Sequence, residues 1–267
     1  MRTHFWLLLL LSFATPLQAQ QASPARELRV LFVGNSLTYV NNLPATLRAL
    51  AASQPRAIPI ITSTYVAPGG TVAERWKDGI ASAALREGHW DAVVLQERGG
   101  LLACMTDAEQ RQQSECRASE RAHKDFAALA RAAGARTLLL ATWGPDETWQ
   151  LKLDRAVRQL ASRTSAEVVP AGSVLRAWAA AHSSEATFPD KVHPSVPATL
   201  IMAGQLYRAI TGNDAQAADV TLDFALLPPM AAVKPDTPLE QQPQLKGDGR
   251  KVVVRTDAMK ALLEAAR

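Results

Sequence analysis

The chain has 267 residues, a length that fits one large α/β domain or two small ones. Hydrophobic residues make up 48% and charged residues 20% of it, which is too apolar a composition for a disordered protein. Lys and Arg number 29 against 25 Asp and Glu, a net charge of +4. Because the basic residues are scattered rather than gathered in a stripe, we expect no nucleic-acid partner.

The first residues predict a secretory signal peptide. Arg2 precedes an apolar run over residues 5–13, and Pro16 and Ala19 follow it. The run is well short of the roughly 20 residues that a bilayer requires, so an uncleaved membrane anchor is the weaker alternative. We expect cleavage near Ala19, a secreted or periplasmic protein, and no membrane span in the mature chain.

Five short apolar runs follow in the mature chain, and several are rich in β-branched residues. They cover residues 28–33, 58–66, 92–95, 137–141 and 166–169. Runs that are apolar on both faces are typical of buried parallel strands. The sequence therefore predicts five strands in the core of a sheet.

Helical patterns separate these runs. Asn42 can cap a helix with Pro44 in its first turn, and Thr71 with Glu74 forms a capping box before a helix that carries Trp76. Apolar residues at helical spacing continue over residues 76–84, 149–160 and 196–210. Strands that alternate with helices predict an α/β fold of three layers, α/β/α, around a five-stranded parallel sheet.

The composition of the sequence changes after Gly212. Residues 226–249 are rich in proline, and we expect them to form a surface connection. A short strand over residues 251–254 and a final helix capped by Thr256 follow. We expect residues 20–218 to form the main domain and residues 219–267 to be an appendage to it.

Cys104 and Cys116, the two cysteines of the sequence, lie close together in a polar stretch. Export would place them in an oxidising compartment, so we expect a disulfide that closes a small loop. A nucleophilic role is the alternative, but neither cysteine lies beside a conspicuous histidine motif. Two cysteines are too few for a four-cysteine zinc site.

Polar and glycine residues follow several of the predicted strands. They are Gly34-Asn35-Ser36 after the first strand, Gly69-Gly70 after the second, Gln96-Glu97 after the third, and Asp190 with His193 further along. In an open parallel sheet, ligands bind outside the carboxyl ends of the strands. A hydroxyl, a glycine N–H, an amide and a carboxylate–imidazole pair at that edge are the components of an acyl-transfer site.

These segments, in this order, resemble the blocks of the SGNH, or GDSL-like, hydrolase superfamily over most of the mature chain. Gly34-Asn35-Ser36-Leu37 stands where that family has Gly-Asp-Ser-Leu, and the Asp190-x-x-His193 block is intact. Gln96 stands in place of the family's Asn, as in a branch that resembles sialate O-acetylesterases or in a neighbouring branch. The resemblance implies a flavodoxin-like arrangement of the three layers.

The resemblance also implies roles for single residues. Ser36 would be the nucleophile, His193 its general base and Asp190 the third member of a catalytic triad. The N–H groups of Ser36 and Gly69 and the side chain of Gln96 would form the oxyanion hole. Gly70 is the alternative to Gly69.

Each of these segments also has a purely structural interpretation. Gly-Asn-Ser can be an ordinary turn, Asp190 can cap the helix that follows Pro194, and Gln96 can anchor a loop. Trp143 and Glu97 are candidates for the substrate pocket, with core packing as the alternative for Trp143 and loop orientation for Glu97.

We therefore expect an exported serine esterase that hydrolyses a small-acyl ester, with acetyl favoured, on a small molecule or a glycan. A glycan O-acyltransferase and a non-catalytic glycan-binding protein are the alternatives. No P-loop, dinucleotide fingerprint or His-Glu-x-x-His motif is present, so we expect neither a cofactor nor a metal.

Overall fold

The computed structural model describes residues 27–247 and 249–267. The expected signal peptide and its cleavage point lie outside the described residues. Within those residues, no helix is both long enough and apolar enough to cross a membrane.

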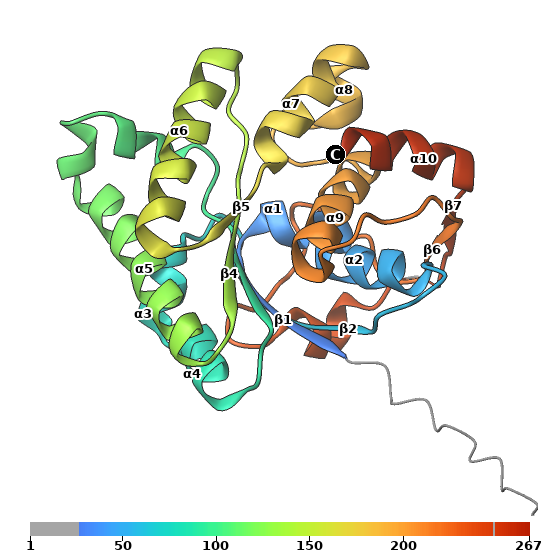
Figure 1. The fold of residues 1–267 in the computed structure, drawn as a ribbon, viewed down its shortest axis with the longest axis horizontal. Helices are drawn as coiled ribbons and strands as arrows, with labels where there is room; N and C mark the ends of the chain where they lie inside the picture. The colour runs from blue at the N-terminus through green and yellow to red at the C-terminus, as the bar shows by residue number, and fades with distance from the viewer. Residues whose placement is uncertain (1–26, 248) are drawn as a thin grey trace, which may run out of the picture.

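The centre of the fold is a parallel sheet of five strands in the order β2-β1-β3-β4-β5 (Figure 1). The strands are β1 (Leu28–Gly34), β2 (Ile60–Val66), β3 (Ala92–Leu95), β4 (Arg136–Leu140) and β5 (Glu167–Val169). All five lie where the sequence predicts them, within two residues at each end. Gly34 pairs with Val66, so β1 and β2 end at the same level of the sheet.

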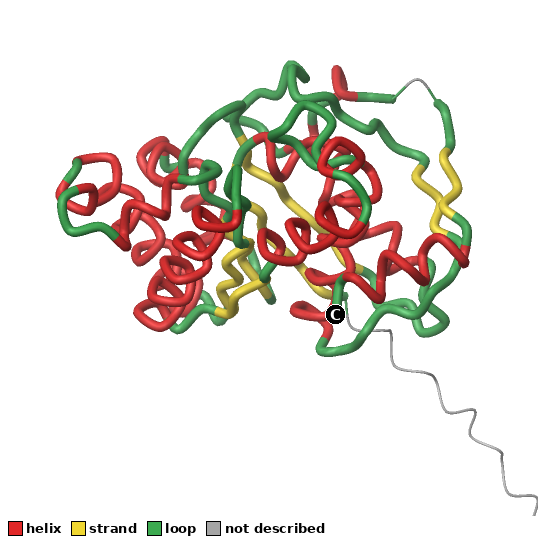
Figure 2. Tube along the Cα trace, turned by 90° about the horizontal axis from the view of Figure 1, so that it is seen from above, coloured by secondary structure: helices red, strands yellow, loops and turns green. Residues whose placement is uncertain are grey.

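Helices connect the strands and form the two outer layers, as Figure 2 shows from a second direction. They are α1 (Ser36–Tyr39), α2 (Leu43–Ala52), α3 (Val72–Asp78), α4 (Ile80–Glu87), α5 (Ser114–Ala132), α6 (Glu147–Thr164), α7 (Ala171–Ala181), α8 (Ser184–Thr187), α9 (Val196–Thr211) and α10 (Thr256–Ala265). The three-layer α/β/α prediction is therefore confirmed.

Side-chain alternation along the strands assigns each helix to one face of the sheet. Val30 and Phe32 of β1 pack in a core with α2, α7, α9 and α10. Leu31 and Val33 point the other way, into a core with α3, α4, α5 and α6. Because both faces are covered, β1 and β3 at the centre are almost wholly apolar, and ligands can approach only at the sheet's ends.

Several elements differ from the sequence prediction, which did not include α7 and α8. The helix expected across residues 71–84 is divided in two, because Gly79 adopts φ +78° and ends α3. Helix α5, which the sequence analysis did not anticipate, covers the sheet between β3 and β4. Thr256 is the first residue of α10 rather than its cap, and its hydroxyl donates to Asp219 instead.

The C-terminal residues share the core of the main sheet. Strand β6 (Val220–Leu222) pairs with β7 (Val252–Val254) in an antiparallel ribbon at the edge of the molecule (Figure 1). Leu222 and Met259 belong to the same buried cluster as β1. Between the two strands, Glu240 accepts hydrogen bonds from the Thr64 N–H (2.9 Å) and the Thr62 hydroxyl (2.6 Å) of the edge strand β2.

The expected disulfide is present. Cys104 lies in a 3₁₀ segment, Leu101–Thr106, and Cys116 lies in the first turn of α5, with 6.1 Å between their Cα atoms. Both residues are buried. The bridge therefore fastens the loop after β3 to α5.

We predict that the double variant Cys104→Ser/Cys116→Ser has a free energy of unfolding about 3 kcal/mol below that of the parent, because the bridge no longer restricts the unfolded chain. Urea titration followed by circular dichroism measures this difference. A reductant should destabilise the parent and leave the double variant unchanged; equal stability of the two proteins without reductant would contradict the prediction.

Candidate active site

Ser36 is the first residue of α1, directly after β1. The Asn35 side chain caps this helix, because its Oδ1 accepts from the Leu37 N–H at 3.0 Å. Its Nδ2 donates to the Gly70 carbonyl at 2.9 Å and joins the turn to the loop after β2. The Asp that stands here in Gly-Asp-Ser-Leu could not make this second bond when ionised, because a carboxylate only accepts.

The side chain of Gln96 lies beneath the same turn. Its Oε1 accepts from the Asn35 N–H at 3.0 Å and from the Thr38 hydroxyl at 2.9 Å. A Cβ on Gly34 would lie 2.7 Å from this Oε1, so a larger residue before Asn35 would push the Gln96 side chain out of this position. The turn that presents Ser36 is therefore built around a buried amide.

This placement corrects the expectation for Gln96. Its Nε2 donates to the Glu97 carbonyl, the residue is only 1% exposed, and it does not line the cleft beside Ser36. The orientation of the amide is determined, because Oε1 must face the Asn35 donor. Gln96 thus anchors the turn, and its N–H is not directed at a bound carbonyl.

Two backbone N–H groups near Ser36 are available to donate to a bound carbonyl oxygen instead. Among the described residues, the N–H groups of Ser36 and Gly69 have no hydrogen-bond partner, whereas the Gly70 N–H donates to Ala67. Ser36 and Gly69 line the cleft, and Gly70 does not. Gly69 has φ +64°, a conformation that favours glycine. Of the two glycines, Gly69 is thus the one that has a free N–H and lines the cleft.

His193 connects Ser36 to Asp190. Its Nε2 lies 2.9 Å from Ser36 Oγ, and its Nδ1 lies 2.7 Å from Asp190 Oδ2. Asp190 Oδ1 accepts from the N–H groups of Val192 (3.0 Å) and His193 (2.7 Å). The Asp190–His193 turn thus brings the carboxylate to the ring nitrogen of a residue three positions away.

The environment keeps Asp190 charged. Partial burial raises the pKa of its carboxyl. The hydrogen bonds from the His193 N–H, the His193 ring and the Val192 N–H lower the pKa by more than burial raises it. The pKa of Asp190 therefore lies below its ordinary value. A carboxylate in this state accepts a hydrogen bond from an N–H at Nδ1. Nε2 is then left as the acceptor for the Ser36 hydroxyl.

The loop that carries His193 is held in place by two side chains. Trp143 donates from its indole N–H to the Val192 carbonyl at 2.7 Å, and its ring packs on Phe188. Asn41 donates to the Pro194 carbonyl at 2.7 Å from the segment after α1. Ser36 and His193 are therefore linked through the protein as well as through their own hydrogen bond.

Ser36 and His193 open into a cleft of about 610 Å³. Its walls include Trp143 and Trp149, and Gly99 and Gly100 from the loop after β3. Trp143 lines the cleft as expected. Glu97 does not: it is 1% exposed and accepts from the Val72 and Arg98 N–H groups and the Ser119 hydroxyl. The expectation that Glu97 lines the substrate pocket is therefore wrong, and its side chain anchors the loop after β3.

Sequence reasoning missed several residues of the site. Tyr39 and Trp149 line the cleft, and Pro229 and Met230 reach it from the proline-rich C-terminal region. Trp149 could have been inferred from its place at the start of the helix after β4. Nothing in the local sequence of Pro229 or Met230 indicates the site, because their position depends on how the distant segment packs.

We predict that Gln96→Ala lowers the free energy of unfolding by about 2–3 kcal/mol, because the buried Asn35 N–H and Thr38 hydroxyl lose their acceptor. Gln112→Ala, a change at an exposed glutamine, is the control and should be neutral. Urea titrations of the three proteins measure the effect. Parent-like stability of Gln96→Ala would show that Gln96 does not anchor the turn.

No protein-family model matches the chain, and no curated protein matches it. Solved structures do: 43 chains match. A candidate SGNH hydrolase from Slackia heliotrinireducens is 24% identical, covers 68% of this chain and 98% of its own, and superposes with a TM-score of 0.55.

Two other solved structures have the same fold. A candidate GDSL-like lipase from Parabacteroides merdae is 14% identical, covers 69% of this chain and 95% of its own, and gives a TM-score of 0.52. An acetylxylan esterase from Geobacillus stearothermophilus is 17% identical, covers 68% and 93%, and gives 0.54. The chain therefore has the fold of the SGNH hydrolases.

Proposed function

We propose that the protein is a serine esterase in which Ser36, His193 and Asp190 form the catalytic triad. The observation that carries this proposal is the continuous line of hydrogen bonds from Ser36 Oγ through both nitrogens of His193 to Asp190. Each bond is within 3 Å, and the hydroxyl faces an open cleft. This arrangement suits a nucleophile and a general base.

The first half of the reaction acylates Ser36. Ser36 Oγ attacks the ester carbonyl carbon while His193 Nε2 takes the hydroxyl proton, and the carbonyl oxygen becomes an oxyanion. The free N–H groups of Ser36 and Gly69 donate to this oxyanion. The tetrahedral intermediate then expels the alcohol, which takes the proton from His193, and the acyl group stays on Ser36.

The second half releases the acid. A water molecule gives a proton to His193 and attacks the acyl carbonyl, and the same two N–H groups stabilise the second oxyanion. Ser36 leaves with the proton from His193, so the enzyme returns to its starting state. Asp190 stabilises the imidazolium in both halves without accepting its proton.

The neighbouring structures support the nature of the site. Three structures of the Geobacillus acetylxylan esterase are described as catalytic mutants, in which a serine, an aspartate or a histidine is replaced by alanine. The aspartate and histidine there are three positions apart, as Asp190 and His193 are here.

The same esterase supports the choice of substrate. Its name is that of an enzyme acting on acetylated xylan. The indole rings of Trp143 and Trp149 at the cleft offer apolar surfaces for the C–H faces of a sugar. We therefore propose an acetyl ester, carried by a carbohydrate, as the substrate.

We also propose that the protein acts outside the cytoplasm. The Cys104–Cys116 bridge supports this location, because structural disulfides persist in oxidising compartments. The basic and apolar pattern of residues 1–19 agrees with it.

We predict that a fluorophosphonate labels Ser36 and that Ser36→Ala and His193→Ala each lower kcat on an aryl acetate by at least about 10⁴-fold, because triad members act as a unit. Ser173→Ala, a change outside the cleft, should keep the parent rate. Peptide mapping by mass spectrometry and steady-state assays test both statements. Parent-like turnover by folded Ser36→Ala would rule out the triad.

A further inference from the structure

Residues 227–230 of the C-terminal region are bonded directly to the segment that carries the nucleophile. The Tyr39 hydroxyl donates to the Pro229 carbonyl at 2.6 Å, and the Asn41 N–H donates to the Leu227 carbonyl at 2.9 Å. Tyr39 is the last residue of α1, three positions after Ser36, and it is fully buried. The position of residues 227–230 is therefore set by the same helix that presents Ser36.

A small apolar core lies behind these residues. Leu227 and Leu239 pack with Tyr39, Val40 and Val66 in a buried cluster of their own. Glu240 then ties the chain to edge strand β2 through Thr62 and Thr64. Anchors on both sides hold the segment in one place against the end of the sheet.

The exposed face of the segment is turned toward the cleft. Met230 lines the cleft, although 92% of its surface is exposed. Trp149 (36% exposed) and Val192 (51%) line it as well. Three of the exposed large hydrophobic side chains in the described part of the chain thus meet at one opening. An apolar group bound there would remove all three from water.

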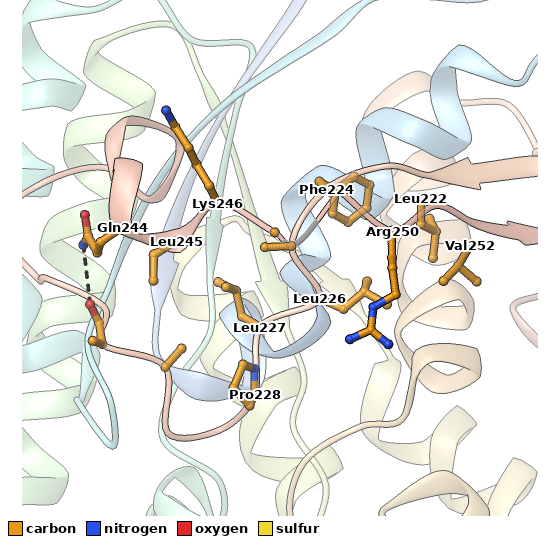
Figure 3. A pocket seen from close by; sticks show the side chains of 14 residues that line it. Leu222, Phe224, Leu226, Leu227, Pro228, Gln244, Leu245, Lys246, Arg250 and Val252 are labelled. Atoms are coloured by element: carbon orange, nitrogen blue, oxygen red, sulfur yellow. Dashed lines mark hydrogen bonds between the residues drawn. The ribbon is translucent and has the colours of Figure 1, made fainter.

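A second hollow beside the same segment is not placed to bind an ester at Ser36. It measures about 530 Å³ and is lined by Leu226, Leu227 and Pro228 from one side and by Leu245 from the other (Figure 3). Neither Ser36 nor His193 borders it. A ligand held there would not reach the nucleophile.

We propose that residues 227–230 form one wall of the substrate cleft and that Met230 binds an apolar group of the ester, on its acyl side or its alcohol side. This inference rests on the esterase function proposed above and adds a specificity-determining residue to it. Met230 is flexible and polarisable, so it can adapt to an apolar group of varied shape.

The test compares Met230→Ala, Met230→Leu and Leu151→Ala with the parent. Leu151 is 58% exposed and does not line the cleft, so its truncation is a matched control. Aryl esters with acetyl, butyryl and hexanoyl groups vary the acyl side, and methyl, phenyl and naphthyl acetates vary the alcohol side. The readout is the ratio of kcat/KM for the largest ester to that for the smallest in each series.

We expect Met230→Ala to lower this ratio about five- to tenfold in one series, the one whose varied group contacts Met230, because the contact buries less apolar surface. Met230→Leu should restore most of the ratio, and Leu151→Ala should keep it. Ratios equal to those of the parent in both series would overturn the proposal.

A binding measurement separates this inference from the esterase proposal. Ser36→Ala protein should bind 1-naphthyl acetate, followed by tryptophan fluorescence, and adding Met230→Ala should weaken that binding about five- to tenfold. If the parent hydrolyses no ester while this weakening is found, the proposed activity fails and the apolar site stands. Binding that Met230→Ala does not weaken, as expected for a ligand in the hollow of Figure 3, would overturn the site itself.

Discussion

The amide of Gln96 lies beneath the turn that presents Ser36, and its oxygen accepts hydrogen bonds from the Asn35 N–H and the Thr38 hydroxyl. Gln96, which follows β3, thus supplies the acceptor for two donors at the start of α1. Gly34 leaves room for that oxygen, since any Cβ there would collide with it. With the Asn35 N–H occupied from below, the Ser36 N–H remains free to face the cleft. The turn that presents Ser36 is therefore held in place by a side chain that does not line the cleft.

The remaining parts of the site are bonded to this turn one after another. Asn35 fastens the loop of Gly69 through the Gly70 carbonyl, and Asn41 fastens the loop of His193 through the Pro194 carbonyl. Tyr39 holds the C-terminal segment through the Pro229 carbonyl. These three residues follow β1 within a few positions, so a single short stretch of chain organises loops from three distant parts of the sequence. Catalysis by fixed N–H donors requires this kind of preorganisation, because the donors must be in place before charge develops.

The sequence was sufficient to predict the sheet, because strands that are covered on both faces are mostly apolar or β-branched and differ from the segments around them. It also identified Ser36, Asp190 and His193, which the structure brings within hydrogen-bond distance of one another. Helix α5 was missed, since it is polar over most of its surface and buries a narrow stripe that includes Phe126. The placement of Gln96 was wrong because its side chain could reach either the cleft or the turn, and only the packing around Gly34 decides between them. No local sequence pattern indicates that Met230 lines the cleft, because its position there depends on tertiary contacts of a proline-rich segment.

In the proposed mechanism, the free N–H groups of Ser36 and Gly69 bind the oxyanion while Gln96 supports the turn from beneath. A crystal structure of the protein after reaction with a methyl fluorophosphonate measures this directly, since the phosphonyl oxygen takes the place of the oxyanion. We expect this oxygen to lie about 2.7–3.1 Å from the N–H nitrogens of Ser36 and Gly69, with Gln96 Oε1 still accepting from the Asn35 N–H. A Gln96 amide turned into the cleft to donate to the phosphonyl oxygen, or an adduct oxygen remote from Gly69, would contradict it.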